Sequence, residues 1–541
     1  MASVATPPKP WNEKIFSYEP GSECREKLQA ELDKQLRHVE SIPTVIGGQR
    51  FESGSQISIR APHDHQHELA RLHTVTKEQV QSAIQTSVAT QRAWSDLPWE
   101  HRAAVFLKAA DLLANKYRWK INAATMLGQG KSCFQAEIDA ACELADFLRF
   151  NVSFARQIYQ EQPMYSDHGL WNRVEVRGLE GFVFAIGPFN FTAISVNLAA
   201  APALMGCGVL WKPAPQAALA SWYMLEILEE AGLPPGVIQM VNGDPKMIGD
   251  LALASPDLSG IHFTGSTQTF DHIWSTVGSK IRDYKHYPRI VGETGGKDFV
   301  FMHEEADPQQ VVTGLIRGAF EYQGQKCSAA SRAYIPSSRW AELKPILVEQ
   351  CASLKMGNPC DFNNFMGPVI DEKSFKKIQG YIDYAKESKD AEVICGGECL
   401  GDTGYFVQPT LVVTTNPKHK LMIEEIFGPV LTLYVYDADK LDETLELCDQ
   451  STPYALTGAI FAKNRQTIEM LSQKLKYSAG NFYINDKPTG AVVGQQPFGG
   501  SRRSGTNDKA GSALNLQRWV SHRTMKENFV TPVDHHYPHM G

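Results

Sequence analysis

Three residues that lie far apart in the chain have side chains suited to carbonyl chemistry. Cys327 lies in "GQKCSAA", Glu293 in "GETGGK" and Asn190 in "GPFNFTA". A cysteine sulfur can attack a carbonyl carbon, an amide N–H can stabilise the charge that develops on the oxygen, and a carboxylate can activate water. Each residue also has an ordinary interpretation: an inert loop thiol, a solvated turn carboxylate, and a turn or N-cap asparagine.

The elements expected around two of these residues would place them at strand ends. Glu293 follows the apolar run "RIV", and Asn190 lies where "GFVFAIG" gives way to a helical run that starts near Thr192. Short apolar runs, among them "GVLWK", "GVIQMV" and "GIHFTG", alternate with helical ones in this part of the chain. The alternation predicts a doubly wound parallel sheet, which binds ligands at the carboxyl ends of its strands.

Helices are expected before this sheet and a second α/β stretch after it. Residues 77–160 carry apolar residues three and four positions apart, which predicts helices. From "RIVGETGGKDFVFM" to "GAIFAKN", apolar runs again alternate with helical ones such as "QQVVTGLIRGAFEY". A chain of 541 residues is too long for one hydrophobic core, so the second stretch is expected to form a second domain.

The composition is that of a globular protein and excludes several classes of function. With 21% charged residues and a net charge of -7, the chain has no basic footprint for nucleic acid. No apolar run reaches the ~18 residues of a membrane span, and the start has neither a signal h-region nor an Arg-rich presequence. The close pair Cys395 and Cys399 lacks a second pair of metal-ligand residues nearby, so no metal site is expected.

Seven motifs, taken together and in this order, resemble the aldehyde dehydrogenase superfamily over nearly the whole chain. They are "PFNF", "WKP", "FTGS", "GETGGK", "GQKCSA", "EEIFGPV" and "PFGG". The stretch "FYINDKPTGAVVGQQPFGG" and the following "SGTNDKAGSALNLQRWVSHRTMKE" are similar to the branch that acts on glutamate γ-semialdehyde. Phe270 departs from the broader pattern, which has a second glycine in the phosphate loop.

The resemblance implies an α/β fold of two doubly wound parallel-sheet domains plus a small β oligomerisation element. Residues 1–165 and 181–292 would form the NAD-binding domain, with an N-terminal helical part. Residues 293–500 would form the catalytic domain. Residues 166–180 and 515–541 would form the oligomerisation element and tail.

The resemblance also implies the reaction. Cys327 would attack the aldehyde, while the Asn190 amide and the Cys327 backbone N–H would hold the oxyanion of the thiohemiacetal. After hydride transfer to NAD, Glu293 would activate water to hydrolyse the thioester. The expected function is oxidation of L-glutamate γ-semialdehyde, in equilibrium with 1-pyrroline-5-carboxylate, to L-glutamate, the second step of proline catabolism. The alternatives are a dehydrogenase of another dicarboxylate semialdehyde, such as succinate semialdehyde, and an inactive protein on this fold.

Two further sets of residues follow from the resemblance. The expected cofactor contacts, from the adenosine ribose through the pyrophosphate to the nicotinamide, are Lys212, Gly265, Ser266, Glu425 and Phe427. The expected substrate contacts, from the carboxylate through the aliphatic stem to the ammonium, are Ser328, Gly490, Ala491, Phe191, Phe498 and Glu143. Pro215 stands where many NAD-preferring relatives have a ribose-binding glutamate, so NAD with some use of NADP is expected. A carboxylate on a helix, such as Glu143, is usually just solvated.

Partners and compartment are expectations from the same resemblance. The partner would be a small-molecule substrate, with neither nucleic acid nor a membrane span. At least a homodimer is expected, with strand exchange that involves "WNRVEVRGL" and the C-terminal tail. The eukaryotic relatives work in the mitochondrial matrix and the bacterial ones in the cytoplasm. The matrix is therefore expected, although no transit peptide is readable in the sequence.

Overall fold

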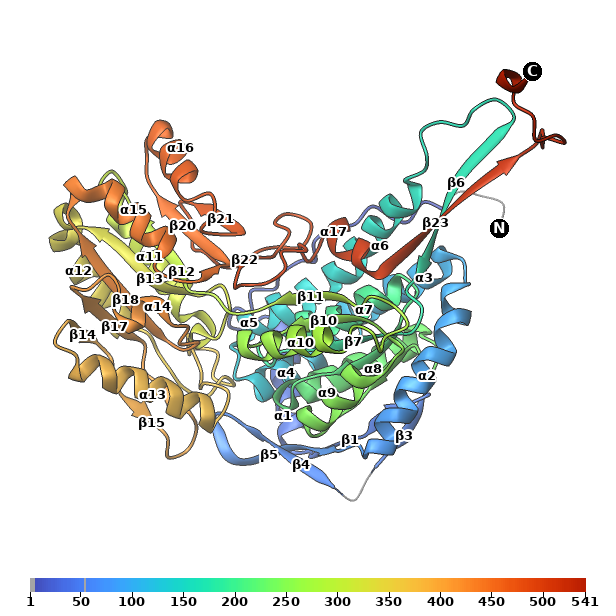
Figure 1. Ribbon diagram of the computed structural model, residues 1–541. Coiled ribbons are helices and arrows are strands. Elements are labelled where there is room, and N and C mark those ends of the chain that lie inside the picture. Colours follow the sequence, from blue (N-terminus) through green and yellow to red (C-terminus); the bar gives the residue numbers. More distant parts are fainter. Residues whose placement is uncertain (1–4, 53–54) are drawn as a thin grey trace.

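Two seven-stranded sheets, each covered by helices on both faces, form the body of the protein (Figure 1). The computed structural model describes residues 5–52 and 55–541. Residues 1–4 and 53–54, which the predicted segment 1–165 includes, lie outside the described residues. In Figure 1 the sheet built from the first half of the chain lies to the right of the sheet built from the second half.

The first sheet has the order β11-β10-β7-β8-β9-β2-β3. Its strands are β2 (Thr44–Ile46), β3 (Gln49–Phe51), β7 (Phe182–Ile186), β8 (Gly208–Lys212), β9 (Ile238–Met240), β10 (Leu258–Thr264) and β11 (Arg289–Glu293). Side chains alternate between the two faces of a strand. Val183 and Ala185 therefore pack in one core cluster, whereas Phe182 and Phe184 pack in another on the opposite face.

Helices that precede these strands in the chain, or connect them, cover the two faces of the first sheet. They are α2 (Lys77–Ser95), α3 (Trp99–Ala114), α6 (Leu144–Gln160), α7 (Thr192–Leu204), α8 (Ala218–Ala231), α9 (Pro245–Ala254) and α10 (Thr267–Ser279). Side chains of α3, α6, α7 and α8 join the cluster of Val183, and those of α2, α9 and α10 join the cluster of Phe182. The sheet is thus buried on both faces, as expected of parallel strands.

The second sheet has the order β14-β17-β18-β13-β12-β20-β21. Its strands are β12 (Asp298–Met302), β13 (Ala330–Pro336), β14 (Ala391–Cys395), β17 (Thr410–Thr414), β18 (Val430–Tyr436), β20 (Thr457–Phe461) and β21 (Asn481–Ile484). Its covering helices are α11 (Pro308–Phe320) and α12 (Ser337–Ala352) on one face, and α15 (Leu441–Gln450) and α16 (Arg465–Lys474) on the other. The predicted α/β fold class with two such sheets is confirmed.

The two sheets are parallel except at their edges, and the chain before residue 77 contains strands that the sequence did not predict. The edge pairs β2–β9, β2–β3 and β14–β17 are antiparallel. Residues 40–73 contain strands, including a three-stranded sheet of β1 (Glu40–Ile42), β4 (Gln56–Ala61) and β5 (Asp64–His73). These strands are short or rich in polar residues, so no run of apolar residues marks them.

The predicted helical region 77–160 is confirmed, with one difference. It contains α2, α3, α4 (Arg118–Gln129), α5 (Cys133–Ala136) and α6, but Glu137–Glu143 forms a π-helix, η1. A π-helix has wider turns than an α-helix and often occurs at functional sites. Apolar spacing does not separate the two over so short a stretch, which is why the sequence did not predict it.

A two-stranded ribbon projects from the body of the molecule (Figure 1). It consists of β6 (Leu170–Gly178) and β23 (Val520–Asn528), paired antiparallel along their whole length. The remaining elements are α1 (Glu23–Leu36), α13 (Glu372–Glu387), α14 (Lys420–Ile423), α17 (Ala513–Leu516), β15 (Cys399–Leu400), β16 (Phe406–Val407), β19 (Tyr454–Ala455) and β22 (Ser501–Arg502). Among the described residues, no helix combines the length and apolarity needed to span a bilayer.

Candidate active site

Four neighbouring strands of the first sheet end at the same edge. Residues that the sequence analysis selected lie at or just after these strand ends. Lys212 ends β8 and pairs with Ile186 at the end of β7. Ile186 also pairs with Phe263 in β10, and the next residue of β10, Thr264, pairs with Glu293. The carboxyl ends of these parallel strands therefore bring Lys212, the start of α10 and Glu293 to one edge, where doubly wound sheets bind ligands.

A cavity of about 390 Å³ opens beside this edge. Eight of the predicted residues line it: Cys327, Glu293, Ser328, Gly490, Ala491, Phe191, Phe498 and Glu143. They come from both halves of the chain and from the loop that follows β21. The volume is in the range of small-molecule sites.

Cys327 lies on a tight loop between α11 and β13. Tyr322 and Gln323 in this loop have positive φ angles of 53° and 55°, and a Cβ on Gly324 would lie 2.3 Å from the carbonyl oxygen of Gly428. The thiol is half-buried, and its pKa lies well above the usual value because of burial and the nearby carboxylates, with Asp298 the largest contributor among them. This environment disfavours the thiolate, which is the nucleophilic form of a cysteine.

Asn190 is buried behind the cavity wall, with 4% of its surface exposed. Its Nδ2 donates a hydrogen bond of 3.0 Å to the carbonyl of Gln325, two residues before Cys327. The neighbouring Phe191 lines the cavity, whereas Asn190 does not. Since an asparagine amide carries two N–H donors, the bond to Gln325 fixes the side chain and leaves a second donor.

Glu293 ends β11 and its carboxyl group points into the cavity wall. Its backbone carbonyl accepts a 3.1 Å hydrogen bond from the N–H of Gly265. Its Oε2 is buried and has no hydrogen-bond partner among the described residues. Burial raises the pKa of this carboxyl well above the usual value, and the Gly500 N–H and Lys509 only partly oppose that shift. This is the direction expected of a general base that works near neutral pH.

Glu425 and Phe427 reach the same region from the second half of the chain. Oε1 of Glu425 accepts a 2.9 Å hydrogen bond from the N–H of Gly296, and a Cβ on Gly295 would lie 2.5 Å from the Glu425 carboxylate. Phe427 has a φ of 59°, and its ring meets Phe189 edge-on at 5.8 Å. The "GETGGK" turn and the loop before β18 thus pack directly on each other.

Lys212, at the end of β8, and Ser266, at the start of α10, fit a dinucleotide. The amine of Lys212 is buried, and its one hydrogen bond within the described residues is a long one of 3.5 Å to the Pro213 carbonyl. Burial lowers the pKa of Lys212 to about 8. Ser266 caps α10 by accepting from the Thr269 N–H at 3.3 Å, and the N-terminus of such a helix favours a phosphate.

Phe270, the departure from the broader family pattern, belongs to the core beneath the phosphate loop. Its ring stacks on Phe263 with centroids 5.4 Å apart. A Cβ on Gly292 would lie 2.3 Å from the Phe270 ring, so that glycine leaves room for it. Phe270 is thus a packed residue of α10, and Ser266 remains the N-cap of that helix.

The predicted carboxylate-binding residues lie beside the cysteine loop. The Ser328 hydroxyl is 2.8 Å from the hydroxyl of Thr489. Gly490, the next residue, has a φ of 99°, a conformation that other residues rarely adopt. Ala491 follows in the cavity wall. Ser328, Thr489 and this turn therefore lie side by side in the cavity wall.

Glu143 ends η1 in the cavity wall and does not lie on a solvated helix face. Burial and the neighbouring Asp139 raise its pKa well above the usual value, while Lys131 and Lys326 oppose that shift. Lys131 pairs with Asp139 at 2.6 Å and lies over the ring of Phe191, 4.0 Å from its centroid. Glu143 is therefore a carboxyl that a cationic ligand would help to ionise.

A family model described as "Aldehyde dehydrogenase family" matches residues 50–525. The chain belongs to the aldehyde dehydrogenase family. The mitochondrial delta-1-pyrroline-5-carboxylate dehydrogenase of Dictyostelium discoideum is 53% identical, over 98% of this chain and 96% of that protein. The mitochondrial protein of the same name from Homo sapiens is 46% identical, over 98% of this chain and 94% of that one.

A solved structure of the delta-pyrroline-5-carboxylate dehydrogenase from Mycobacterium tuberculosis, bound with NAD, has the same fold. It is 50% identical to this chain, covers 100% of both chains and has a TM-score of 0.96. The two sheets and the ribbon described above are thus those of an aldehyde dehydrogenase.

Sequence reasoning missed several residues that complete the wall of this aldehyde dehydrogenase site. Lys326, next to Cys327, pairs with Glu321 at 3.1 Å, and Glu321 also pairs with Lys487 at 2.8 Å. Thr489 directly precedes Gly490 in the quoted motif, so its hydroxyl could have been noticed. The N-terminal residues Asn12 and Glu13 also line the cavity, and nothing in their local sequence points to it.

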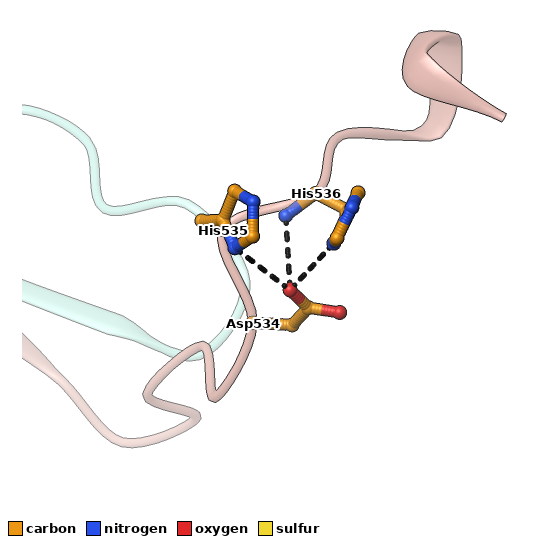
Figure 2. Close-up of side chains that lie close together, drawn as sticks. All are labelled: Asp534, His535 and His536. Carbon is orange, nitrogen blue, oxygen red and sulfur yellow. Dashed lines mark hydrogen bonds and ion pairs between the residues drawn. The ribbon is translucent and has the colours of Figure 1, made fainter.

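The one group of possible metal ligands among the described residues lies far along the chain from this site. Asp534, His535 and His536 are exposed on the tail that follows β23 (Figure 2). The Asp534 carboxylate lies 2.7 Å from Nδ1 of His536 and 3.3 Å from Nδ1 of His535. Neither Cys395 nor Cys399 belongs to such a group in the described part of the chain.

Proposed function

We propose that this aldehyde dehydrogenase oxidises L-glutamate γ-semialdehyde, the open form of 1-pyrroline-5-carboxylate, to L-glutamate with NAD, in the second step of proline catabolism. The observation that carries the proposal is the single cavity lined by Cys327, Glu293, Glu143 and the turn at Gly490. Such a cavity offers a nucleophile, a base, a carboxylate for an ammonium group and donors for a carboxylate. Relatives with the corresponding name are 46–53% identical over nearly the whole chain.

The thiol of Cys327 gives its proton to solvent, and the sulfur forms a bond to the aldehyde carbon while the carbonyl π electrons move to the oxygen, which gives the oxyanion of a thiohemiacetal. The second N–H of Asn190 and the backbone N–H of Cys327 donate to its oxyanion. NAD, when bound, would supply the acceptor for the hydride of this carbon, and Cys327 would then carry a thioester. Glu293, with its unpartnered Oε2, takes a proton from water, which attacks the thioester and releases the carboxylate and the thiol.

The amino-acid end of the substrate would lie across the cavity from the reacting carbon. The hydroxyl of Ser328 and the backbone N–H groups of Gly490 and Ala491 would donate to its carboxylate. Glu143 would pair with its ammonium group. The rings of Phe191 and Phe498 would flank the aliphatic stem.

The cofactor contacts follow the strand ends. Lys212 would donate to the adenosine ribose, Gly265 and Ser266 would contact the pyrophosphate, and Glu425 and Phe427 would contact the nicotinamide half. Pro215, the first residue of a 3-10 turn after β8, supplies no carboxylate against a 2′-phosphate. We expect a higher kcat/KM with NAD, which the similar solved structure binds, than with NADP, and the missing carboxylate leads us to expect measurable use of NADP as well.

Assembly, domains and compartment belong to the same proposal. We assign residues 1–165 and 181–292 to an NAD-binding domain, 293–500 to a catalytic domain, and 166–180 with 515–541 to an oligomerisation element. The ribbon of β6 and β23 would join two copies in a homodimer or a larger homo-oligomer. The mitochondrial names of relatives support a place in the mitochondrial matrix.

NADH formation with a panel of aldehydes tests the proposed substrate. Glutamate γ-semialdehyde should give the highest kcat/KM, above succinate semialdehyde, which lacks the α-amino group, and above simple alkyl aldehydes. Cys327→Ala should abolish NADH formation while a binding titration still finds NAD bound. A preference for succinate semialdehyde would assign the chain to the alternative substrate, and no activity on any aldehyde would refute the enzymatic function.

A further inference from the structure

A short N-terminal segment, residues 11–16, forms part of the wall of the active-site cavity. We call it the N-terminal strap. Its residues Asn12, Glu13 and Ile15 line the cavity together with Cys327 and the turn at Gly490. The catalytic and substrate roles proposed above use none of these three residues, although they come from the far end of the chain.

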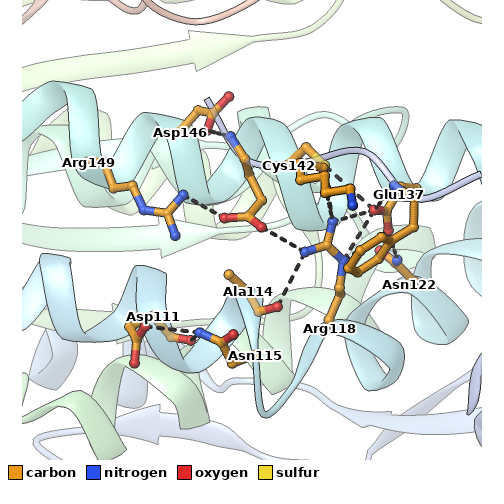
Figure 3. A network of polar contacts seen from close by, with 12 residues as sticks. Asp111, Ala114, Asn115, Arg118, Asn122, Glu137, Cys142, Asp146 and Arg149 are labelled. Atoms are coloured by element: carbon orange, nitrogen blue, oxygen red, sulfur yellow. Dashed lines mark hydrogen bonds and ion pairs between the residues drawn. The ribbon is translucent and has the colours of Figure 1, made fainter. Parts of the chain in front are cut away.

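Buried ion pairs fix the strap to the helices beneath it. The Glu13 carboxylate pairs with Arg118 of α4 at 2.9 Å and with Arg149 of α6 at 2.7 Å. The two arginine side chains are only 2% and 7% exposed. Arg118 also pairs with the fully buried Glu137 of η1. Figure 3 shows Arg118 turned toward Glu137, with Arg149 and Asp146 along the neighbouring helix. Since charges this buried need partners, the strap has a fixed place.

The side chain of Asn12 joins the strap to α6 and to the loop that follows Gly490. Both the nitrogen and the oxygen of its amide form hydrogen bonds. Its Nδ2 donates to Oδ2 of Asp146 in α6 and to the carbonyl of Val493, both at 2.8 Å. Its Oδ1 accepts from Nε2 of Gln495 at 2.9 Å. The Asp146 carboxylate also accepts from the Glu13 backbone N–H at 2.7 Å. Asn12 is thus a bridge between α6 and the loop that follows Gly490.

The loop of residues 490–496 is held partly by its own contacts, such as the 3.0 Å hydrogen bond from the Val492 N–H to Oε1 of Gln496, and partly by those with Asn12. Gly490, three residues before Val493, and Gly494, between Val493 and Gln495, have positive φ angles of 99° and 82°. Glycine pays the largest loss of backbone freedom when a conformation is fixed. Val493 lies three residues after Gly490 and two after Ala491, so a shift of its carbonyl would move the backbone N–H groups of the turn.

We propose that Asn12 is a positioning residue that sets the enzyme's preference for the amino-acid end of the aldehyde, by holding the loop of residues 490–496 against α6. The proposal rests on the proposed function, because it concerns the donors that would bind the substrate carboxylate. Asn12 itself would touch neither the reacting carbon nor the cofactor. Its removal should weaken recognition of the carboxylate and leave the chemistry at Cys327 in place.

The test compares two substrates in Asn12→Ala: glutamate γ-semialdehyde and butanal, which has no amino-acid end. The kcat/KM for glutamate γ-semialdehyde divided by that for butanal should fall about tenfold, the equivalent of ~1.4 kcal/mol. Most of the loss should appear as a higher KM for glutamate γ-semialdehyde, with kcat at saturation largely kept. Asn12→Asp, which loses both donors and faces the Asp146 carboxylate, should lower the ratio at least as much.

Two matched variants show whether a changed ratio comes from loss of the Asn12 bridge or from a general effect on folding. Gln495→Ala removes the loop side of the same bridge at an exposed residue and should lower the ratio in the same direction. Asn115→Ala removes an exposed asparagine that bonds only to Asp111 of its own helix and should leave the ratio unchanged.

Two outcomes would overturn the proposal while the proposed function stands: a ratio within twofold of the wild type in Asn12→Ala, or equal losses on both aldehydes. A wild-type enzyme with no preference for glutamate γ-semialdehyde over butanal would remove the proposed function first, and this inference with it.

Discussion

Burial acts in the same direction on the two reactive groups, since it raises the pKa of the Cys327 thiol and that of the Glu293 carboxyl. Both groups are therefore neutral more often than exposed groups would be. For the base this is useful, because a carboxylate with a raised pKa is a stronger proton acceptor. For the thiol it is a disadvantage, because the thiolate is the nucleophilic form.

Glu293→Gln should lower kcat about 10²- to 10⁴-fold, the usual contribution of a general base. Because the base acts deprotonated and its pKa is raised, wild-type kcat should rise with pH through that raised pKa, and the variant should lose this limb. Its first turnover should still release NADH as a burst. A pH profile of kcat that stays the same in Glu293→Gln would assign water activation to another group.

Asn190→Ala should lower kcat by about 10²- to 10³-fold, the usual cost of one oxyanion donor. The loss should fall on the burst of NADH as well as on steady turnover, because the oxyanion forms before hydride transfer. The fixed hydrogen bond to Gln325 makes Asn190→Asp a second probe, since it removes both donors at nearly constant shape. Rapid-mixing absorbance at the NADH band measures both variants, and an unchanged burst would remove Asn190 from the mechanism.

Lys212 gives a prediction about the pH dependence of cofactor binding. Burial lowers its pKa to about 8, so the amine is charged below that pH and loses its proton above it. If the charged amine donates to the adenosine ribose, the Kd for NAD should rise between pH 7 and pH 9. Lys212→Met should bind NAD several-fold more weakly at pH 7, as expected for a lost charged donor, and with a flatter pH dependence. Parallel pH dependences of wild type and variant in a fluorescence titration would contradict this role.

Among the elements, the buried parallel strands were the most readable. "GVLWK" coincides with β8, and "GFVFAIG" and "GIHFTG" overlap β7 and β10, because strands buried on both faces are continuous apolar runs. The strands between residues 40 and 73 were not predicted, since β5 alternates charged, histidine and apolar residues without a regular period. The antiparallel edges were also missed, because strand direction depends on partners far away in the chain.

The ribbon gives a prediction at the scale of elements. Trp171 in β6 is 52% exposed, and Phe529 and Val530 just after β23 are 63% and 71% exposed. Large apolar side chains that are exposed on one ribbon favour contact with another protein surface. Trp171→Asp combined with Phe529→Asp should lower the molar mass measured by light scattering from that of an oligomer toward 60.1 kDa.

Tyr477→Asp, at an equally exposed aromatic residue away from the ribbon (69% exposed), is the control and should not change the mass. An unchanged mass in the Trp171/Phe529 variant, or a wild type that is already a monomer, would refute the ribbon as the assembly surface.

At the scale of the whole molecule, the active site forms where the two halves of the chain meet. Glu143 lies in η1 and Glu293 ends β11 of the first sheet, whereas Cys327 precedes β13 and the turn at Gly490 follows β21 of the second sheet. The order of the motifs allowed these residues to be expected together, because the family resemblance spans the chain. The strap residue Asn12 could not be expected, since 481 positions separate it from Val493 and only the folded chain brings them into contact.

The central claim is that glutamate γ-semialdehyde becomes an acyl group on Cys327 while its hydride passes to NAD. The most direct test is mass spectrometry of Glu293→Gln mixed with NAD and glutamate γ-semialdehyde, because this variant should form the thioester and hydrolyse it slowly. We predict a glutamyl group on the peptide that contains Cys327, in step with one NADH per active site. NADH without an adduct, or an adduct on another of the ten cysteines, would contradict the account.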